Sequence, residues 1–266
     1  MAAHMMIQHR GDGEYIVGAS GEDIMAIIEK WIVNGAVRLH ALESVPAEPS
    51  TQVPLLIIPG VFGNAEDYLD EMARLAPRRC LAVSLRGRGH SDLPASGYAL
   101  EDHVSDVAAA VAQCGFNRPA MMGYAMGAAY ATAYAIKAPQ SISALIIGDY
   151  PARYRSLSEK WVATALESMG ERARPEVAHA LQRASAQVSL WEHLESIRCP
   201  IAVLRGGQSG SMVTEEIVAK YREFAPRAEI LTIEANGHEL WKPDFAVYMA
   251  IIENFLARID SSPTRD

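Results

Sequence analysis

Cysteine is scarce in this sequence and is not arranged to bind a metal. Cys80, Cys114 and Cys199 are the three cysteines among 266 residues, and they lie far apart along the chain. An odd number without C-x-x-C or Cys/His spacing argues against a zinc site and against a disulfide framework. Reduced thiols of this kind are typical of a cytoplasmic protein. We therefore expect no metal and a cytoplasmic location.

The sequence also lacks long apolar runs and basic segments. Its longest apolar stretches have the length of a strand, short of the roughly 20 residues that a membrane-spanning helix requires. The formal net charge is −8, and the phosphates of a nucleic acid repel a surface of that sign. No secretory signal peptide is visible. These absences remove nucleic acids and membranes from the expected partners.

Internal repeats and low-complexity segments are absent too, and the composition is that of a globular protein. Half of the residues are hydrophobic and 21% are charged, which is ordinary for such chains. The length suits one large domain with an insertion. From residue 55 onward, apolar strand-like runs alternate with helical patterns. This alternation predicts an α/β fold with a mostly parallel, twisted sheet and helices on both faces.

The two ends of the chain give weaker signals. Residues 1–6 resemble a cloning remnant followed by a native start, and they are left out of the fold prediction. Residues 7–28 fit a short helix that begins near Ser20, or an irregular arm. The Asn34-Gly35 pair between two apolar segments predicts a β-hairpin. Residues 261–266 are expected to form a frayed tail.

One short turn carries the strongest functional signal. Residues 123–127 read Gly-Tyr-Ala-Met-Gly, with an apolar run before them and a helical pattern of small residues after them. Glycines at both ends let a tight turn pass close to its neighbours. Strand, sharp turn and helix in this order resemble the nucleophile elbow of the α/β-hydrolases, whose pattern is G-x-S-x-G. The central residue here is Ala125, so the hydroxyl of the nucleophile is missing.

The resemblance covers about residues 30 to 258 and implies a domain organisation. An α/β-hydrolase core would be formed by residues 7–150 and 197–260. Residues 151–196 lie between two core strands, where this family inserts a small helical cap that covers the pocket. The cap segment contains Trp161 and several short helical patterns.

Two loops resemble further parts of the family pattern. Residues 59–63, Pro-Gly-Val-Phe-Gly, follow an apolar strand and occupy the place of the oxyanion loop. The resemblance implies that the N–H groups of Val61 and Met126, with Phe62 as an alternative donor, stabilise charge on a carbonyl under attack. The alternative is a plain turn between strand and helix. Residues 86–92 match the family's R-G-x-G-x-S loop and predict a tight surface turn.

The remaining catalytic groups are predicted from chain order, which in this family runs nucleophile, acid, histidine. His238 follows the last strand and is the expected base. The loop at residues 207–211, where the acid usually lies, has no carboxylate. Asp149, just before the cap, occupies the other position used in the family and is the expected acid. Glu215 and Glu216 are fallbacks, although they suit the first turn of a helix. Alternatively, Asp149 is a hinge residue bonded to backbone N–H groups.

Two hypotheses explain the alanine. In the first, the parent protein has serine at position 125, and the chain is a Ser→Ala form of an otherwise complete enzyme. In the second, the alanine is natural and the protein is a non-catalytic binding module. Loss of the nucleophile in a serine protease lowers turnover by about a million-fold. Under both hypotheses the chain as written is expected to be nearly inert.

The resemblance implies a serine-type hydrolase or acyltransferase acting on an ester, thioester or lactone of a small molecule, with no cofactor. Phe62, Tyr124 and Trp161 are the expected substrate contacts. Arginines in the cap segment could attract an acidic group, such as a carboxylate or the phosphopantetheine of a carrier or coenzyme A, although arginines on a solvated cap are commonplace. An alternative is cofactor-free chemistry of the His/Asp pair in a dioxygenase, lyase or carbon–carbon hydrolase. The oligomeric state is left open.

Overall fold

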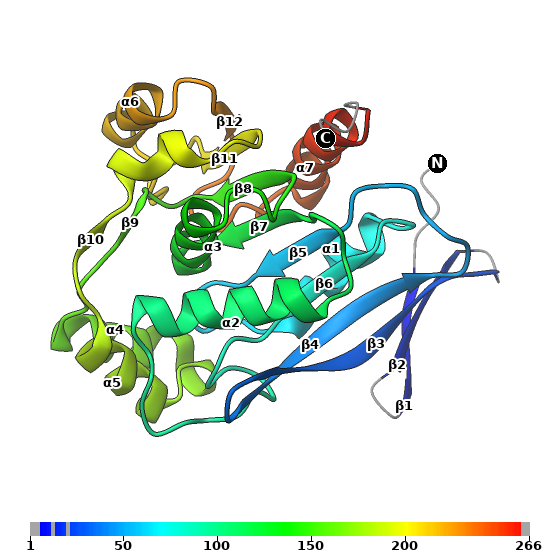
Figure 1. Ribbon diagram of the computed structural model, residues 1–266, viewed down its shortest axis with the longest axis horizontal. Helices are drawn as coiled ribbons and strands as arrows, with labels where there is room; N and C mark the ends of the chain where they lie inside the picture. The colour runs from blue at the N-terminus through cyan, green and yellow to red at the C-terminus, as the bar shows by residue number, and fades with distance from the viewer. Residues whose placement is uncertain (1–5, 12–13, 20–21, 262–266) are drawn as a thin grey trace.

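A ten-stranded sheet with helices on both faces forms the body of the molecule (Figure 1). The computed structural model describes residues 6–11, 14–19 and 22–261. The strands lie in the order β1-β2-β3-β4-β6-β5-β7-β8-β11-β12. Pairing is antiparallel from β1 to β6 in this order and parallel from β6 to β12. The prediction of an α/β-hydrolase fold with a mostly parallel sheet is confirmed.

The bounds of the core elements follow the alternation expected from residue 55 onward. The strands are β1 (Met6–Gly11), β2 (Glu14–Ala19), β3 (Glu22–Asn34), β4 (Val37–Pro46), β5 (Leu55–Ile58), β6 (Cys80–Val83), β7 (Ala120–Tyr124), β8 (Ala144–Gly148), β11 (Ile201–Gly206) and β12 (Glu229–Ile233). The core helices are η1 (Ala65–Tyr68), α1 (Leu69–Arg74), α2 (Leu100–Gln113), α3 (Met126–Lys137), α6 (Glu215–Phe224) and α7 (Phe245–Asp260).

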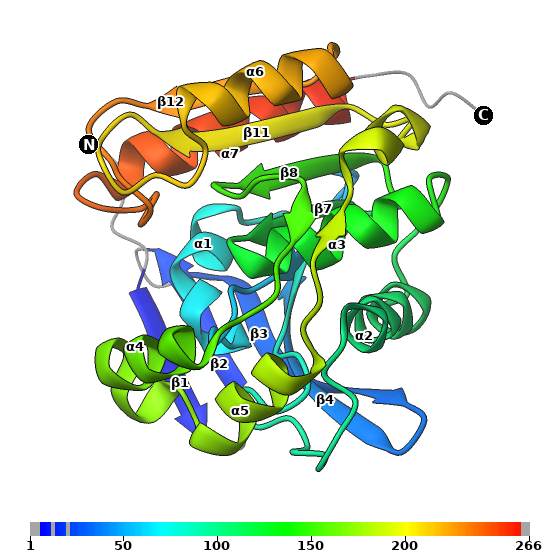
Figure 2. The same cartoon turned by 90° about the vertical axis from the view of Figure 1, so that its left-hand side faces the viewer.

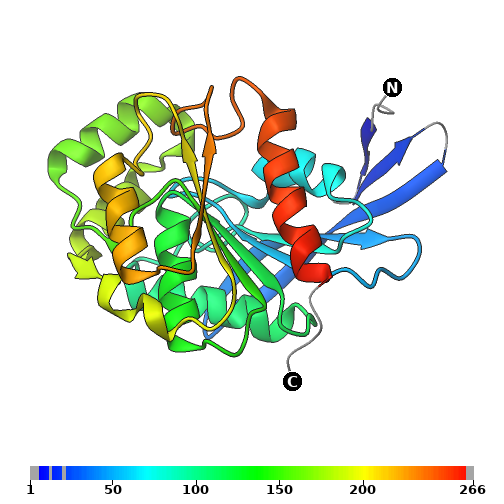
Figure 3. The same cartoon turned by 90° about the horizontal axis from the view of Figure 1, so that it is seen from above.

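Side chains of the central strands alternate between two apolar layers. In β5, Leu56 and Ile58 join the layer under α2, α3 and α6, whereas Leu55 and Ile57 join the layer under α1 and α7. Successive side chains of a strand point to opposite faces, so a strand covered on both faces reads as an uninterrupted apolar run. Figure 3 shows α7 and α6 on opposite sides of the sheet.

The N-terminal region extends the sheet. The helix considered for residues 7–28 is wrong, because β1, β2 and the start of β3 occupy the described part of that range. These antiparallel strands continue the edge of the sheet beyond β4 (Figure 1). The predicted hairpin is present, but Asn34 pairs with Val37, so the turn residues are Gly35 and Ala36. Gly35 has a φ of +61°, which glycine adopts without a steric penalty.

The cap, residues 151–196, lies between β8 and β11. It contains β9 (Arg153–Tyr154), α4 (Glu159–Met169), η2 (Gly170–Arg172), α5 (Pro175–Ala184), β10 (Val188–Ser189) and η3 (Trp191–Ser196). Strands β9 and β10 pair antiparallel and connect α4 and α5 to the core (Figure 1), and in the view of Figure 2 α4 and α5 lie below α1 and β7. The Arg172 guanidinium lies 2.6 Å from the Asp67 carboxylate, and Arg174 donates to the Gly89 carbonyl oxygen at 2.9 Å. The cap therefore covers the loops that follow β5 and β6.

None of the helices in the described part of the chain combines the length and apolar character that a bilayer crossing demands.

Candidate active site

The turn between β7 and α3 holds Ala125 in a strained conformation. Its φ and ψ are 48° and −126°, a region that costs a non-glycine residue about 1–3 kcal/mol and is found mainly at functional sites. The flanking glycines permit the turn, as predicted. A Cβ on Gly127 would lie 2.2 Å from the Pro59 carbonyl oxygen, and one on Gly123 would lie 2.6 Å from the Ala128 Cα. Residue 125 is thus presented at the tip of a sharp elbow.

His238 and Asp149 are brought together as the sequence predicted. The His238 Nδ1 lies 2.8 Å from Asp149 Oδ2. Asp149 follows β8 and is completely buried, whereas the His238 side chain is 35% exposed. Since a carboxylate only accepts hydrogen bonds, Nδ1 carries the proton and Nε2 is free to accept one. This is the tautomer that a general base for residue 125 requires.

The Asp149 carboxylate is held by three further donors. Oδ1 accepts from the Ser211 hydroxyl at 2.5 Å and from the Val213 N–H at 3.1 Å, and Oδ2 accepts from the Met212 N–H at 2.9 Å. Sequence reasoning missed these donors. They come from the segment after β11, the place where the family usually carries the acid. The absence of a carboxylate from that loop was the available signal. The loop instead supplies hydrogen-bond donors to the carboxylate of Asp149, which follows the neighbouring strand β8.

Tyr124 connects the elbow to the histidine loop. Its ring stacks on the His238 imidazole with centroids 5.2 Å apart, and its hydroxyl donates to the His238 carbonyl oxygen at 2.9 Å. The other link runs through Ala125, whose N–H donates to the Gly148 carbonyl oxygen at 2.8 Å, next to Asp149. These contacts hold residue 125 and the His/Asp pair in one unit. Substrate contact by Tyr124 stays a prediction, and its hydroxyl is already used.

The expected oxyanion loop passes beside the elbow. A Cβ on Gly60 would lie 3.7 Å from the Ala125 Cβ, and the Gly63 N–H donates to the Gly60 carbonyl oxygen at 3.1 Å, closing a turn. Met126 is the first residue of α3, so its N–H has no intrahelical acceptor and lies at the positive end of the helix dipole. The roles of Val61 and Met126 as oxyanion donors stay predictions that this placement allows.

The cap meets residues 59–63, the expected oxyanion loop, through two aromatic rings. Phe62 and Trp161 stack with centroids 5.8 Å apart and an interplanar angle of 20°. Phe62 is buried and Trp161 is half-buried. Their contact connects the cap helix α4 to the loop that passes beside the elbow. Both residues remain predicted substrate contacts.

Other residues singled out from the sequence lie away from the site. Glu215 is 82% exposed and pairs with Arg205 at 2.6 Å, and Glu216 is 80% exposed. Neither is positioned to act as the acid. The loop at residues 86–92 forms turns, as predicted, but lies at the surface only in part, because His90 is exposed whereas Arg86 and Arg88 are buried. Arg86 pairs with the buried Asp106 at 2.7 Å.

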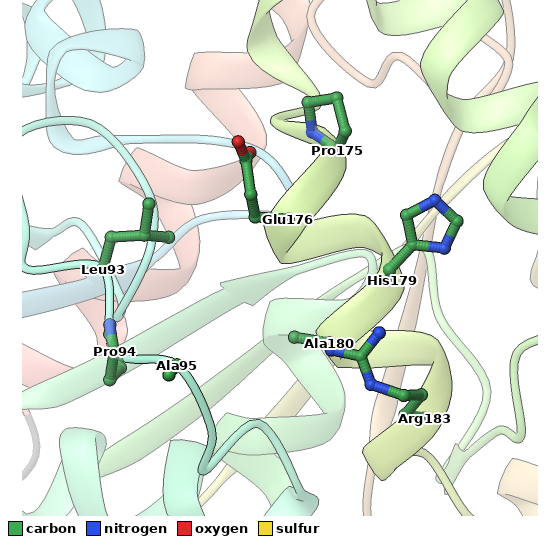
Figure 4. Close-up of a pocket in the computed structure, with 8 residues that line it drawn as sticks. All are labelled: Leu93, Pro94, Ala95, Pro175, Glu176, His179, Ala180 and Arg183. Carbon is green, nitrogen blue, oxygen red and sulfur yellow. The ribbon is translucent and has the colours of Figure 1, made fainter.

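A groove of about 490 Å³ lies between cap helix α5 and the loop after β6 (Figure 4). It is lined by Leu93, Pro94, Ala95, Pro175, Glu176, His179, Ala180 and Arg183. None of the predicted site residues lines this groove, so it is separate from the candidate active site. Across the described residues, no group of three or more His, Cys, Asp or Glu side chains is arranged to hold a metal.

Sheet order, the elbow and the His/Asp pair define the class: the chain has the α/β-hydrolase fold. A family model described as alpha/beta hydrolase fold matches residues 53–175, which span the loop at residues 59–63, the elbow and Asp149.

Relatives in sequence and structure are distant. A candidate 2-succinyl-6-hydroxy-2,4-cyclohexadiene-1-carboxylate synthase of Bacillus subtilis (strain 168) is 20% identical over 260 residues, covering 79% of this chain and 93% of the relative. The 2-(acetamidomethylene)succinate hydrolase of Mesorhizobium japonicum is 28% identical over 97 residues, covering 36% of this chain and 35% of the relative.

Solved structures resemble the whole fold. The N-formylmaleamic acid deformylase of Pseudomonas putida S16, crystallised as a serine-to-alanine variant, superposes with a TM-score of 0.71 at 21% identity over 85% of this chain and 100% of that chain. The enol-lactonase of Burkholderia xenovorans LB400 gives 0.71 at 15% identity over 86% of this chain and 100% of that chain. Similarity at these identities establishes the fold alone.

Proposed function

We propose that the parent of this chain is a serine-type hydrolase or acyltransferase, with residue 125 as the nucleophile position. The observation that carries the proposal is the buried Asp149–His238 pair, joined to a strained elbow through Tyr124 and the Ala125 N–H. Strain at a residue with no functional side chain is hard to explain unless that position once presented a hydroxyl.

The proposed reaction uses the following steps. With serine at 125, its Oγ attacks the acyl carbon while His238 Nε2 takes the hydroxyl proton. Charge on the carbonyl oxygen is stabilised by the N–H groups of Val61 and Met126. His238 then returns the proton to the departing alcohol or thiol, and the acyl group stays on residue 125. Water, activated by His238, releases the acid and restores the enzyme, whereas a second alcohol or thiol would complete an acyl transfer.

The substrate class is an ester, thioester or lactone of a small molecule, carrier-linked or coenzyme A-linked substrates included. The fold relatives support this range, since they include an enol-lactonase and a thioesterase domain. Three relatives carry names that refer to carboxylic acids: a cyclohexadiene carboxylate, a substituted succinate and N-formylmaleamic acid. The parent is therefore proposed to act on an acyl compound that bears a carboxylate.

The chain as written lacks the nucleophile and is proposed to be the inactive form. Restoring the hydroxyl with Ala125→Ser tests the whole assignment. The Ala125→Ser protein should hydrolyse p-nitrophenyl acetate and acyl thioesters, while the Ala125 chain shows background rates only. A folded Ala125→Ser variant that hydrolyses neither class of substrate would refute the proposal.

One observation favours a second candidate, cofactor-free chemistry by the His/Asp pair. The pair is fully assembled with alanine at 125, and Asp149 precedes the cap, the position that the acid takes in cofactor-free dioxygenases of this fold. In that case His238 would deprotonate an aromatic substrate such as a hydroxyquinolone. Oxygen uptake by the Ala125 chain, abolished in a His238→Ala variant, would favour this function over acyl transfer.

A further inference from the structure

Arg88 is a buried cation whose guanidinium is incompletely bonded. The residue is 3% exposed. Its Nε donates to the Val61 carbonyl oxygen at 2.8 Å, and its Nη1 donates to the Arg86 carbonyl oxygen at 2.6 Å and lies 2.8 Å from His103 Nε2. Its Nη2 is buried and has no hydrogen-bond partner among the described residues. Two N–H groups therefore point into protein without an acceptor.

The positive charge of Arg88 is not compensated by its neighbours. No carboxylate of the described chain forms an ion pair with it, and the nearby Asp106 is taken by Arg86. Burial and the charge of Arg88 hold the pKa of His103 well below its usual range, so that ring is neutral and accepts from Arg88. An unpaired buried charge costs several kcal/mol. A bound anion would offset that cost.

Buried tyrosine hydroxyls surround the same guanidinium. The hydroxyls of Tyr98, Tyr130 and Tyr154 are buried and have no hydrogen-bond partner among the described residues. The Tyr130 ring stacks on His103 at 4.4 Å and lies 5.9 Å from the Tyr154 ring. Burial raises the pKa of Tyr154 to about 12 and holds the pKa of Tyr130 well above its usual range, and the nearby charge of Arg88 opposes the rise in both. Both hydroxyls therefore keep their protons and can donate at neutral pH.

These groups lie next to the candidate active site. The bond from Arg88 to Val61 attaches the guanidinium to the oxyanion loop. Tyr130 is on α3, one turn beyond Met126, and Tyr154 is on β9 at the start of the cap. Both tyrosines belong to the same buried layer as Ala125 and Phe62. The donors therefore lie where the oxyanion loop, α3 and the start of the cap meet.

We infer that Arg88, Tyr130 and Tyr154 form a carboxylate-binding subsite that recognises an acid group on the acyl part of the substrate. The inference deepens the proposed function and rests on it. A carboxylate is acceptor-only, with room for about four hydrogen bonds, and here meets two N–H and two O–H donors. It also balances the charge of Arg88, which an uncharged ester or a water molecule would not.

The test compares two substrates that differ only in this charge. Glutaryl-N-acetylcysteamine and its methyl ester are hydrolysed by the Ala125→Ser protein, and the ratio of the two kcat/KM values is measured, with succinyl and adipyl analogues to vary the reach. We expect the acid to be preferred at least tenfold at one chain length. Arg88→Met should abolish the preference, and Tyr130→Phe or Tyr154→Phe should each reduce it several-fold.

The ratio is insensitive to a general loss of activity, which matters because Arg88 also supports the oxyanion loop. The tyrosine variants keep the buried rings and remove only hydroxyls that interact with Arg88 and with each other, so they are expected to fold. Arg183→Met, on an exposed arginine of α5 in the same cap, is the matched control and should keep the full preference. A ratio near one at every chain length, or an equal loss in Arg183→Met, would overturn the subsite.

A binding measurement separates this inference from the proposed function. The Ala125 chain binds the same thioester and its methyl ester in calorimetric titrations, without turnover. Tighter binding of the acid that disappears in Arg88→Met supports the subsite even if Ala125→Ser shows no hydrolysis. Hydrolysis without any discrimination between acid and methyl ester supports the function and rejects the subsite.

Discussion

Replacing Asp149 with asparagine tests the His/Asp pair at the level of single hydrogen bonds. The carboxylate accepts four: from Ser211 Oγ, from the Met212 and Val213 N–H groups, and from His238 Nδ1. The asparagine amide keeps one acceptor oxygen and has an NH₂ donor in place of the other oxygen. In either orientation that donor faces one of the two backbone N–H groups, which is left unsatisfied.

The orientation of the amide decides what the substitution does to the rate. If the NH₂ group faces Ser211, the oxygen still accepts from His238, and only the charge is lost. If the NH₂ group faces His238, Nδ1 must accept a hydrogen bond. The imidazole proton then lies on Nε2, and Nε2 cannot act as a base. In serine proteases the second situation lowers turnover about 10⁴-fold. One buried unsatisfied N–H costs about 1–3 kcal/mol of stability. We expect a rate loss of about 10²- to 10⁴-fold with a loss of stability in that range.

The assay measures kcat for an aryl ester in the Ala125→Ser background, together with urea unfolding. Ser211→Ala removes one donor and leaves the charge, so its rate should fall by at most about 150-fold, since one hydrogen bond to a charged group is worth about 1.5–3 kcal/mol. Glu215→Gln, on an exposed carboxylate paired with Arg205, should leave the rate unchanged. Turnover within threefold of the Ala125→Ser protein in a folded Asp149→Asn variant would refute the assignment of the acid.

Two further substitutions test the elbow and a buried acid. Gly127→Ala should lower stability by more than about 3 kcal/mol, because its Cβ would lie 2.2 Å from a backbone oxygen, whereas Gly170→Ala, in open space at a φ of +54°, should cost only about 1–3 kcal/mol; equal losses by urea unfolding would contradict this. Burial raises the pKa of Glu71 from 4.5 to about 7, so the folded state keeps a proton that the unfolded chain releases. The free energy of unfolding should therefore fall as pH rises from about 4.5 to 7, by up to about 3 kcal/mol. Glu71→Gln should remove this fall, and an unchanged difference between pH 5 and pH 8 would count against it.

Local steric rules and chain order made much of the site predictable. The glycines at 123 and 127 mark the elbow in the sequence pattern of strand, turn and helix, although the atoms that exclude a Cβ at Gly127 belong to the distant Ile58 and Pro59. His238 and Asp149 each follow a strand whose carboxyl end lies at the same edge of a parallel sheet. Such positions converge whatever the intervening loops do.

Contacts between distant segments were not predictable. Ser211 meets Asp149 only because β11 pairs with β8, and Tyr124 meets His238 across 114 residues. Arg88 lies in a loop whose glycines and charges resemble a surface turn, and the cap that covers this loop is inserted much later in the chain. The sequences of the strands at residues 6–11 and 14–19 show no clear alternation of apolar and polar residues. These strands extend the edge of the sheet and are not part of its central, apolar strands.

The central claim is that residue 125 is the position of the catalytic nucleophile and that His238 activates it. Treating the Ala125→Ser protein with a fluorophosphonate and locating the adduct by peptide mass spectrometry tests it directly. We predict stoichiometric labelling at residue 125, none in the Ala125 chain, and labelling slowed at least a hundredfold when His238→Ala is added. A folded Ala125→Ser protein that stays unlabelled, or that labels equally fast without His238, would contradict the account.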